Sequence, residues 1–187
     1  ALGAAAGFLR STLAQEFEKA RFYVDPETVS DASIAGVCIL FEEGAYALRG
    51  RRPVRNLFVK AGRAGFVAKV VDPSGAEVGD IGMTLRKHED GAWRIQRIAL
   101  DALLRDYAGR QGGGDIYYTP LVRNPEGGSS IALYFGFDDA DLSERSRRQL
   151  RIVAGLLKVD SSKRIKISGH ADALGSEDYN LSLSRQR

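Results

Sequence analysis

Apolar and polar residues in the first part of the chain repeat with the period of an α-helix. Apolar side chains recur among charged ones at Phe8, Leu9, Leu13, Phe17, Ala20 and Phe22. This spacing predicts an amphipathic helix over residues 8–23. Pro26, with Asp25 before it as a capping side chain, predicts the start of a second segment, helical or mixed, that runs to Leu48. The apolar run 37–41 inside this segment is also typical of a strand.

The middle of the chain changes to an alternation of period two, which is typical of half-buried strands. Three strands are predicted, over residues 65–71, 78–87 and 93–98. The two connections between them, 72–75 and 88–91, carry the Gly, Pro and Asp residues of hairpin turns. We therefore predict an α+β fold in which N-terminal helices pack on a curved antiparallel sheet.

Glycines indicate a boundary between two domains. Segment 109–114 ends in three consecutive glycines, which leave the backbone free and are typical of a linker. We expect an α+β module of unknown role over residues 1–110, a Gly-rich linker over 111–129 and a second domain over 130–187. Residues 116–122 are expected to pair as an edge strand with one domain or the other.

The second domain alternates predicted strands with predicted helices. The apolar run 131–137 predicts a buried strand, and Ser143 predicts the N-cap of a helix with Glu144 in its first turn. Alternating charged and apolar residues predict a half-buried strand over 164–167. The turn 169–172 follows this strand and leads into another helix. The predicted order is β-α-β-α.

Composition and charge are those of an ordinary folded protein. Hydrophobic residues make up 44% and charged residues 27% of the 187 positions, which is enough apolar material for a core. The net charge of +3 is small, so nucleic acid is not expected as a partner. No apolar run approaches the roughly 20 residues of a membrane-spanning helix. The single cysteine, Cys38, lies in an apolar run and is expected to be a buried thiol.

One stretch is locally basic despite the small net charge. Its cations are Arg49, Arg51, Arg52, Arg55, Lys60 and Arg63. Such a stretch is typical of a solvated loop or strand edge. The alternative is an electrostatic contact with an anionic lipid or glycan surface through phosphate or carboxylate groups.

Two groups of spaced residues in the second domain resemble the OmpA-like peptidoglycan-binding domain. The family pattern runs from a strand ending in G-H-T-D, through a loop with Gly, to Y-N-x-x-L-S-x-x-R. The matching positions are Gly169, His170, Asp172, Gly175, Tyr179, Asn180, Leu183, Ser184 and Arg187, and only the Thr is replaced, by Ala171. Upstream, residues 134–138, followed by Leu142 and Ser143, resemble the family's first strand and the start of its helix. The resemblance covers residues 130–187.

The resemblance implies a binding site for the diamino acid of peptidoglycan stem peptides. This group carries a free ammonium and a free carboxylate, so a binder needs one acid and one base at a fixed separation. In the family pattern the acid is Asp172, which contacts the ammonium, and the base is Arg187, which contacts the carboxylate. Asn180 supports the site by hydrogen bonding.

Three further residues are expected to support the site rather than to contact the ligand. Asp138 is expected to be a structural hydrogen-bond acceptor, Gly169 to begin the turn and His170 to be a packed turn residue. Without the family, Asp172 would be interpreted as a loop cap and Arg187 as an exposed helix residue, so their roles rest on the resemblance.

The resemblance also implies a periplasmic location, associated with the outer membrane or the cell wall, and lipoprotein-like character. The family domain continues past this arginine with another strand and helix, so the domain is expected to be incomplete here. A sheet truncated in this way exposes an edge that invites pairing with a second copy, as in a homodimer.

The first domain resembles the nuclear-transport-factor-two-like fold, in which a curved sheet wraps helices around an apolar pocket. Residues 84–108 are also similar to the end of MlaC-type phospholipid carriers. These likenesses imply an alternative function, a periplasmic carrier of a lipid or small apolar ligand whose second domain is a tether. The partners implied for the first domain are anionic lipid or an envelope protein.

No catalytic constellation is recognisable. Two histidines and one cysteine do not assemble a nucleophile, a base and an orienting group, and none stands at metal-ligand spacing. Residues 112–114 lack the Lys-Ser/Thr of a phosphate-binding loop. We therefore predict a protein without enzymatic activity, cofactor or metal.

Overall fold

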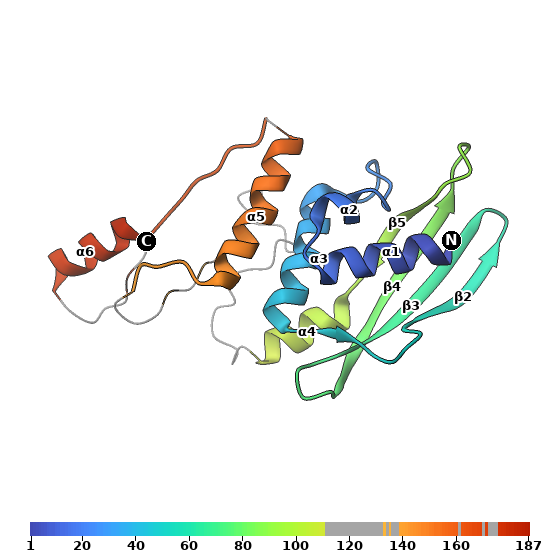
Figure 1. Cartoon of the computed structure of the whole chain (residues 1–187), viewed down its shortest axis with the longest axis horizontal. Coiled ribbons are helices and arrows are strands. Elements are labelled where there is room, and N and C mark those ends of the chain that lie inside the picture. The colour runs from blue at the N-terminus through green and yellow to red at the C-terminus, as the bar shows by residue number, and fades with distance from the viewer. Residues whose placement is uncertain (111–132, 134, 136–138, 161, 170, 172–175) are drawn as a thin grey trace. The chain divides into compact units, whose positions relative to one another are not determined.

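The computed structural model of the chain describes residues 1–110, 133, 135, 139–160, 162–169, 171 and 176–187, and divides into two compact units, Ala1–Ile131 and Ala132–Arg187. The first unit contains α1 (Leu2–Leu13), α2 (Phe17–Arg21), α3 (Asp31–Gly44), β1 (Ala47–Leu48), β2 (Val54–Lys60), β3 (Arg63–Val71), β4 (Glu77–Lys87), β5 (Trp93–Ala99) and α4 (Asp101–Arg110) (Figure 1). The second contains α5 (Glu144–Val159) and α6 (Glu177–Gln186). The predicted α+β class is confirmed.

The helix predicted over residues 8–23 is wrong in its extent, because the chain breaks after α1. Gln15 takes a φ of 60°, in the left-handed region. Its side-chain Nε2 donates to the carbonyl of Thr12 at 3.1 Å and to that of Cys38 at 2.8 Å. The bond to Thr12 satisfies a carbonyl at the end of α1, and the bond to Cys38 attaches this end to α3. The chain then turns into the short helix α2.

The second helix begins later than Pro26. Asp25 caps a turn and not a helix, since its Oδ1 accepts the backbone N–H of Glu27 at 3.0 Å. Helix α3 begins at Asp31, where Ser30 Oγ accepts the N–H of Ser33 at 3.1 Å. Ser in this geometry is a strong N-cap, so the helix start was signalled by a different residue from the one predicted.

The apolar run 37–41 is helical. Its five residues are each at most 5% exposed inside α3. A helix that is apolar on all sides is stable where it is surrounded by the core. Cys38 is fully buried within it, as predicted, and burial raises the pKa of its thiol to about 12.

The sheet is antiparallel, with strand order β1-β3-β4-β5 and β2 paired to β3 on the same edge as β1. The three predicted strands are confirmed as β3, β4 and β5. Strand β2 confirms the interpretation of the basic stretch as a strand edge. Ala61 and Gly62 join β2 to β3 with φ values of 49° and 74°. Positive φ at both positions is the type I′ turn, which fits the twist of a two-residue hairpin.

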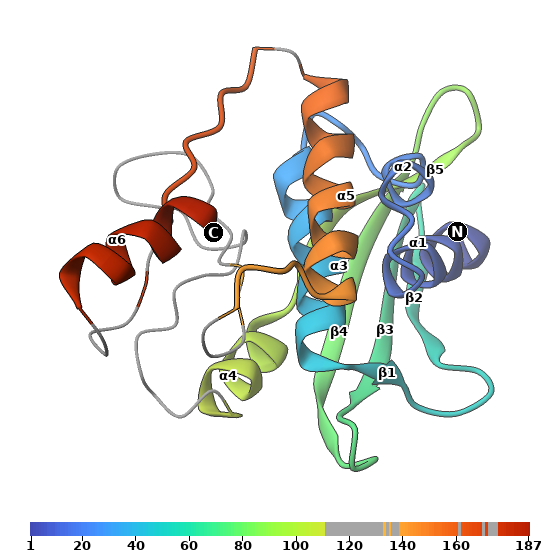
Figure 2. The same cartoon turned by 60° about the vertical axis from the view of Figure 1, so that its left-hand side comes forward.

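One face of the sheet forms the core of the first unit. Its residues are at most 3% exposed: Ala64, Phe66, Ala68, Val70, Ile81, Met83, Leu85 and Ile95. Helix α1 packs against α3 and also contacts β2 and β5 (Figures 1 and 2). Helix α4 lies so close to Gly79 that a Cβ there would be 2.6 Å from Ala102 Cβ. The alternation of period two therefore separates a helix-covered face from an outer face.

The second unit contains the helix predicted after Ser143, whose Oγ accepts the N–H of Ser146 at 3.0 Å. The strand predicted over 164–167 is wrong, because residues 163–169 form no strand and Ile167 is 83% exposed. A strand needs a hydrogen-bonded neighbour, and no described residue pairs with this segment. The linker 111–129, the edge segment 116–122 and the strand 131–137 lie outside the described residues, except Leu133 and Phe135.

Candidate functional site

Helix α6 gathers the motif residues on one face. Ser176 Oγ accepts the N–H of Tyr179 at 3.3 Å and begins the helix. Spacings of three, four and seven residues place side chains on the same side of a helix. The residues so placed are Asn180, Leu183, Ser184 and Arg187. All four are partly buried, whereas the other residues of α6 are exposed. The motif therefore occupies the inward face.

Arg187 is held by the segment that precedes α5. Its Nε donates to the backbone carbonyl of Asp139 at 2.8 Å. Its guanidinium carbon lies 5.2 Å from the centre of the Phe135 ring, which is cation–π distance. Its backbone N–H also donates to the carbonyl of Leu183 at 3.1 Å. These three contacts fix both the backbone and the side chain of the arginine.

Asn180 carries a polar atom without a partner. Its side-chain Oδ1 is buried and accepts a hydrogen bond from no described residue. A buried acceptor without a donor costs about 1–3 kcal/mol, so such an atom is stabilised when a ligand or a neighbouring group supplies an N–H or O–H. The atom lies on the same helix face as Arg187, two turns earlier.

Gly169 brings the preceding segment against the same helix. A Cβ on this residue would lie 1.8 Å from the carbonyl oxygen of Ser184 and 3.7 Å from the carbonyl carbon of Arg187. Only glycine permits this approach. The start of the predicted binding turn is thus in contact with the last turn of α6.

The structure brings together three of the six predicted site residues, namely Gly169, Asn180 and Arg187. Asp172, His170 and Asp138 lie outside the described residues.

Two contacts of the site were not predicted from the sequence: the ring of Phe135 and the carbonyl of Asp139. The apolar run 131–137 predicted burial near the ring, but a continuously apolar run does not indicate which side chain meets the arginine. A backbone carbonyl carries no signal of its own in the sequence.

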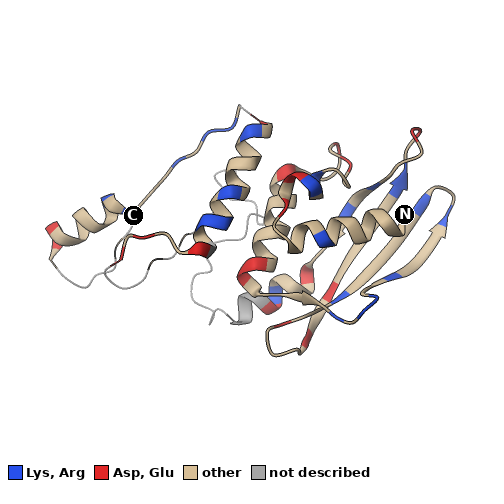
Figure 3. Cartoon of the chain, viewed as in Figure 1, with Lys and Arg blue, Asp and Glu red and all other residues tan. Residues whose placement is uncertain are grey.

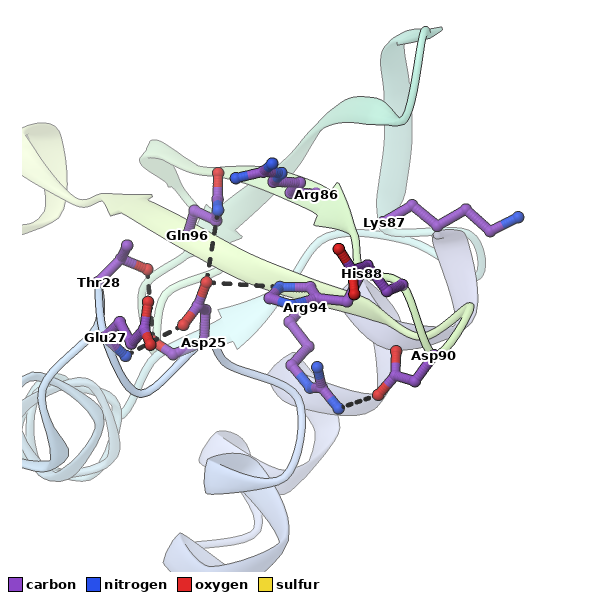
Figure 4. A pocket seen from close by; sticks show the side chains of 10 residues that line it. Asp25, Glu27, Thr28, Arg86, Lys87, His88, Asp90, Arg94 and Gln96 are labelled. Atoms are coloured by element: carbon purple, nitrogen blue, oxygen red, sulfur yellow. Dashed lines mark hydrogen bonds and ion pairs between the residues drawn. The ribbon is translucent and has the colours of Figure 1, made fainter.

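The first unit has a polar pocket of about 500 Å³ that the sequence analysis did not identify (Figure 4). Asp25 lies at its base and is 5% exposed. Its Oδ2 is 3.4 Å from His88 Nε2 and accepts from Gln96 Nε2 at 3.4 Å. Its backbone N–H donates to the carbonyl of Ile95 at 2.9 Å. These contacts attach the 25–29 turn to strand β5 and to the β4–β5 hairpin.

The rim of this pocket is charged. Arg94 forms an ion pair with Asp90 in the hairpin turn, while Arg86 and Glu27 also line the opening. A hydrogen bond from the Ala92 N–H lowers the pKa of Asp90, and a smaller contribution comes from the hydrogen bond of Arg94. Both carboxylate oxygens of Asp25 are engaged by protein groups, so the pocket base is occupied by a structural network.

Neither a metal centre nor a membrane span is found in the part of the chain that the structure describes. No group of three or more His, Cys, Asp and Glu side chains there is placed to hold a metal ion. No described helix has both the length and the apolar character needed to cross a bilayer.

Comparison with known proteins identifies the second unit. Residues 134–187 match the family model of the OmpA family. The chain is also similar to the peptidoglycan-associated lipoprotein of Pseudomonas aeruginosa, with 37% identity over 54 residues. The aligned segment covers 29% of this chain and 32% of the lipoprotein, so it spans about a third of that relative's length. The family match includes Phe135, Asp139 and Arg187, and the C-terminal part of the chain is an OmpA-like domain.

Proposed function

We propose that this chain is a non-enzymatic cell-envelope protein whose OmpA-like domain binds peptidoglycan non-covalently. The observation that carries the proposal is the placement of Arg187, held by Asp139 and Phe135 on the same helix face as Asn180. A planar guanidinium positioned in this way suits two parallel hydrogen bonds to a carboxylate.

The ligand group in this proposal is the diamino acid of the stem peptide. Arg187 binds its carboxylate, and Asp172 binds its ammonium. The unpaired Oδ1 of Asn180 accepts an N–H from the ligand or from a neighbouring side chain. Gly169 sets the distance between the turn and the helix, with Asp138 and His170 in supporting roles. The periplasm, next to the outer membrane or cell wall, is the location that fits this ligand.

Binding of the 187-residue chain to purified peptidoglycan sacculi, measured by co-sedimentation, tests the proposal. We expect Asp172→Ala and Arg187→Ala each to abolish binding, and free diaminopimelic acid to compete with the sacculi for the unsubstituted chain. Arg185→Ala is the matched control, because Arg185 lies on α6 but is exposed on its other side. Equal binding to sacculi by the Arg187 and Arg185 variants would show that Arg187 does not contact the ligand.

The carrier alternative finds less support. It requires an apolar pocket in the first unit, whereas the pocket described there is lined by charged and polar groups such as Asp25, Arg86 and His88. Residues in the middle of that unit, including Phe8, Phe66 and Ile81, are fully or nearly fully buried side chains of a packed core. Mass spectrometry of lipids extracted from the purified chain would detect a bound lipid if the alternative held.

A further inference from the structure

The outer face of the sheet in the first unit is lined with cations at one end. On the opposite, core-forming face, Ala64, Leu85 and Ile95 are registered neighbours and are fully buried. Successive residues of a strand point to opposite faces. The residues that precede or follow them, Arg63 on β3 and Arg86 on β4, therefore point outward.

The strand register joins these arginines into a row. Lys60 lies opposite Arg63, Arg63 opposite Arg86 and Arg86 opposite Arg94. Directly opposed residues of antiparallel strands share a face. The four cations therefore span strands β2 to β5, over roughly 14 Å at about 4.8 Å per strand. Figure 3 shows lysines and arginines on these strands near the β2–β3 and β4–β5 turns.

Further cations extend the row along the same face. The next row of paired residues on this face, farther from the β2–β3 turn, is Phe58, Gly65, Thr84 and Arg97. The row after it begins with Arg55 on β2. We call the six residues Arg55, Lys60, Arg63, Arg86, Arg94 and Arg97 the basic sheet face.

Most of the basic sheet face has no counter-charge. Arg94 pairs with Asp90, but the other five cations form no ion pair with another described residue. At the opposite end of the same face, Lys69 is paired with both Glu77 and Asp80. Like charges opposite one another destabilise a sheet. The contrast indicates that the cations near the hairpin turns face an external anion.

Apolar side chains form the rim of the basic sheet face. Leu57, Phe58 and Val59 on the edge strand β2 are 64%, 46% and 55% exposed. The Phe58 ring lies on Gly65, where a Cβ would be only 2.4 Å from it. Phe58 shares the face of Lys60, whereas Val59 lies opposite Ala64 on the other side of the strand. The edge strand thus carries exposed apolar side chains beside the cations.

We propose that the basic sheet face and its apolar rim dock the first unit on the surface of an anionic phospholipid bilayer. Lys and Arg side chains near such a surface are attracted by its negative potential, and apolar side chains enter the boundary between headgroups and acyl chains. An anionic bilayer surface therefore interacts favourably with both the cations of the basic sheet face and its apolar rim.

A second copy of the chain fits the patch less well. If two β2 edges paired symmetrically about Leu57 and Phe58, Arg55 of one copy would lie opposite Lys60 of the other. Like charges in that position repel. A polyanion such as nucleic acid would neutralise the cations but would leave the apolar rim exposed to water.

Co-sedimentation of the 187-residue chain with lipid vesicles tests the proposal. We expect binding to vesicles of phosphatidylglycerol mixed with phosphatidylcholine, weakening as salt is raised, and little binding to phosphatidylcholine alone. Each cation near an anionic surface contributes about fivefold in affinity, so Arg63→Gln/Arg86→Gln should bind about 25-fold more weakly. Leu57→Ser/Phe58→Ser should also weaken binding, with the salt dependence kept.

The matched control is Arg151→Gln/Lys158→Gln, which removes the same charge from exposed positions on α5. It should bind like the unsubstituted chain. Circular dichroism of each variant verifies that the sheet is folded. Three results would overturn the proposal. They are an equal loss of binding in the Arg63/Arg86 and Arg151/Lys158 variants, equal binding of the unsubstituted chain to neutral and anionic vesicles, and binding to duplex DNA without binding to anionic vesicles.

Discussion

Gly169 lies directly against the backbone of Ser184, such that a Cβ on the glycine would be 1.8 Å from the serine carbonyl oxygen and 2.9 Å from its carbonyl carbon. A backbone atom cannot move aside like the end of a flexible side chain. Any substitution at Gly169 must therefore displace segment 163–169 from α6. Because Asn180 lies on this helix and Arg187 directly follows it, the contact joins the start of the predicted binding turn to the helix face.

Gly169→Ala should therefore weaken both the second unit and its binding to sacculi. Overpacking of this kind typically costs about 1–3 kcal/mol in the free energy of unfolding. Urea unfolding and sacculus co-sedimentation measure the two effects. Gly3→Ala is the control, since a Cβ there meets nothing within 4 Å; it should leave binding unchanged. Wild-type binding by the Gly169 variant would show that the contact does not position the turn.

Asp25→Ala should lower the free energy of unfolding of the first unit by about 1–3 kcal/mol, because it leaves partly buried donors without an acceptor. The donors are the N–H of Glu27 and the amide of Gln96. Urea denaturation gives the value, and a double-mutant cycle with His88→Ala isolates the contribution of the His88 contact. Glu27→Ala, which removes an exposed carboxylate from the same pocket, should change the stability by less than about 0.5 kcal/mol. Similar losses of unfolding free energy in Asp25→Ala and Glu27→Ala would contradict a structural role for Asp25.

The turn after α5 should make a pH-dependent contribution to stability. Hydrogen bonds from the Ser162 hydroxyl, Lys163 and the Ser162 N–H lower the pKa of Asp160 to about 2. An unfolded Asp titrates near about 3.9. Since the folded pKa lies below the unfolded one, the contribution is fully present above about pH 4 and is lost as the pH falls towards 2.

Urea unfolding of the unsubstituted chain and of Asp160→Asn across this range checks the sign. The stability difference between them should shrink as the solution is acidified. A difference that stays constant with pH would mean that the carboxylate is not held in its charged form by these groups.

Cys38 should be inert in the folded protein. Its thiol is fully buried and its pKa is raised to about 12, so almost no thiolate is present at neutral pH. A thiol-reactive chromophore should label the native chain only at the rate at which α3 is exposed, and the chain in urea rapidly. Fast labelling of the native chain would contradict the burial.

Local patterns were sufficient to predict strands β3 to β5, because each hairpin is encoded by residues close together in the sequence. The break at Gln15 was missed because it depends on the carbonyl of Cys38, far along the chain. The run 37–41 was ambiguous since a buried helix and a buried strand are both continuously apolar. The basic stretch could be interpreted only as a loop or a strand edge, because the register of β2 shifts between Asn56 and Phe58 and interrupts the alternation.

The candidate site also has features that local sequence predicts and features that depend on residues far apart in the chain. The seven-residue spacing of Asn180 and Arg187 predicts a shared helix face, and the structure shows that face to be partly buried. The hydrogen bond from Arg187 to Asp139 joins residues 48 apart, so only the tertiary fold determines it. Asp25 and His88 meet for the same reason: their distance in the chain hides them from any local pattern. The roles of Asp172 and Arg187 in binding stay predictions.

The two-residue turn formed by Ala61 and Gly62 has a consequence for surface chemistry. Side chains alternate along a strand, so one extra residue in this turn would reverse every orientation along β2. Arg55, Phe58 and Lys60 would then leave the outer face and point to the helix-covered side of the sheet. The length of a loop that contains no charged residue thus determines whether β2 adds its two cations, Arg55 and Lys60, to the basic sheet face.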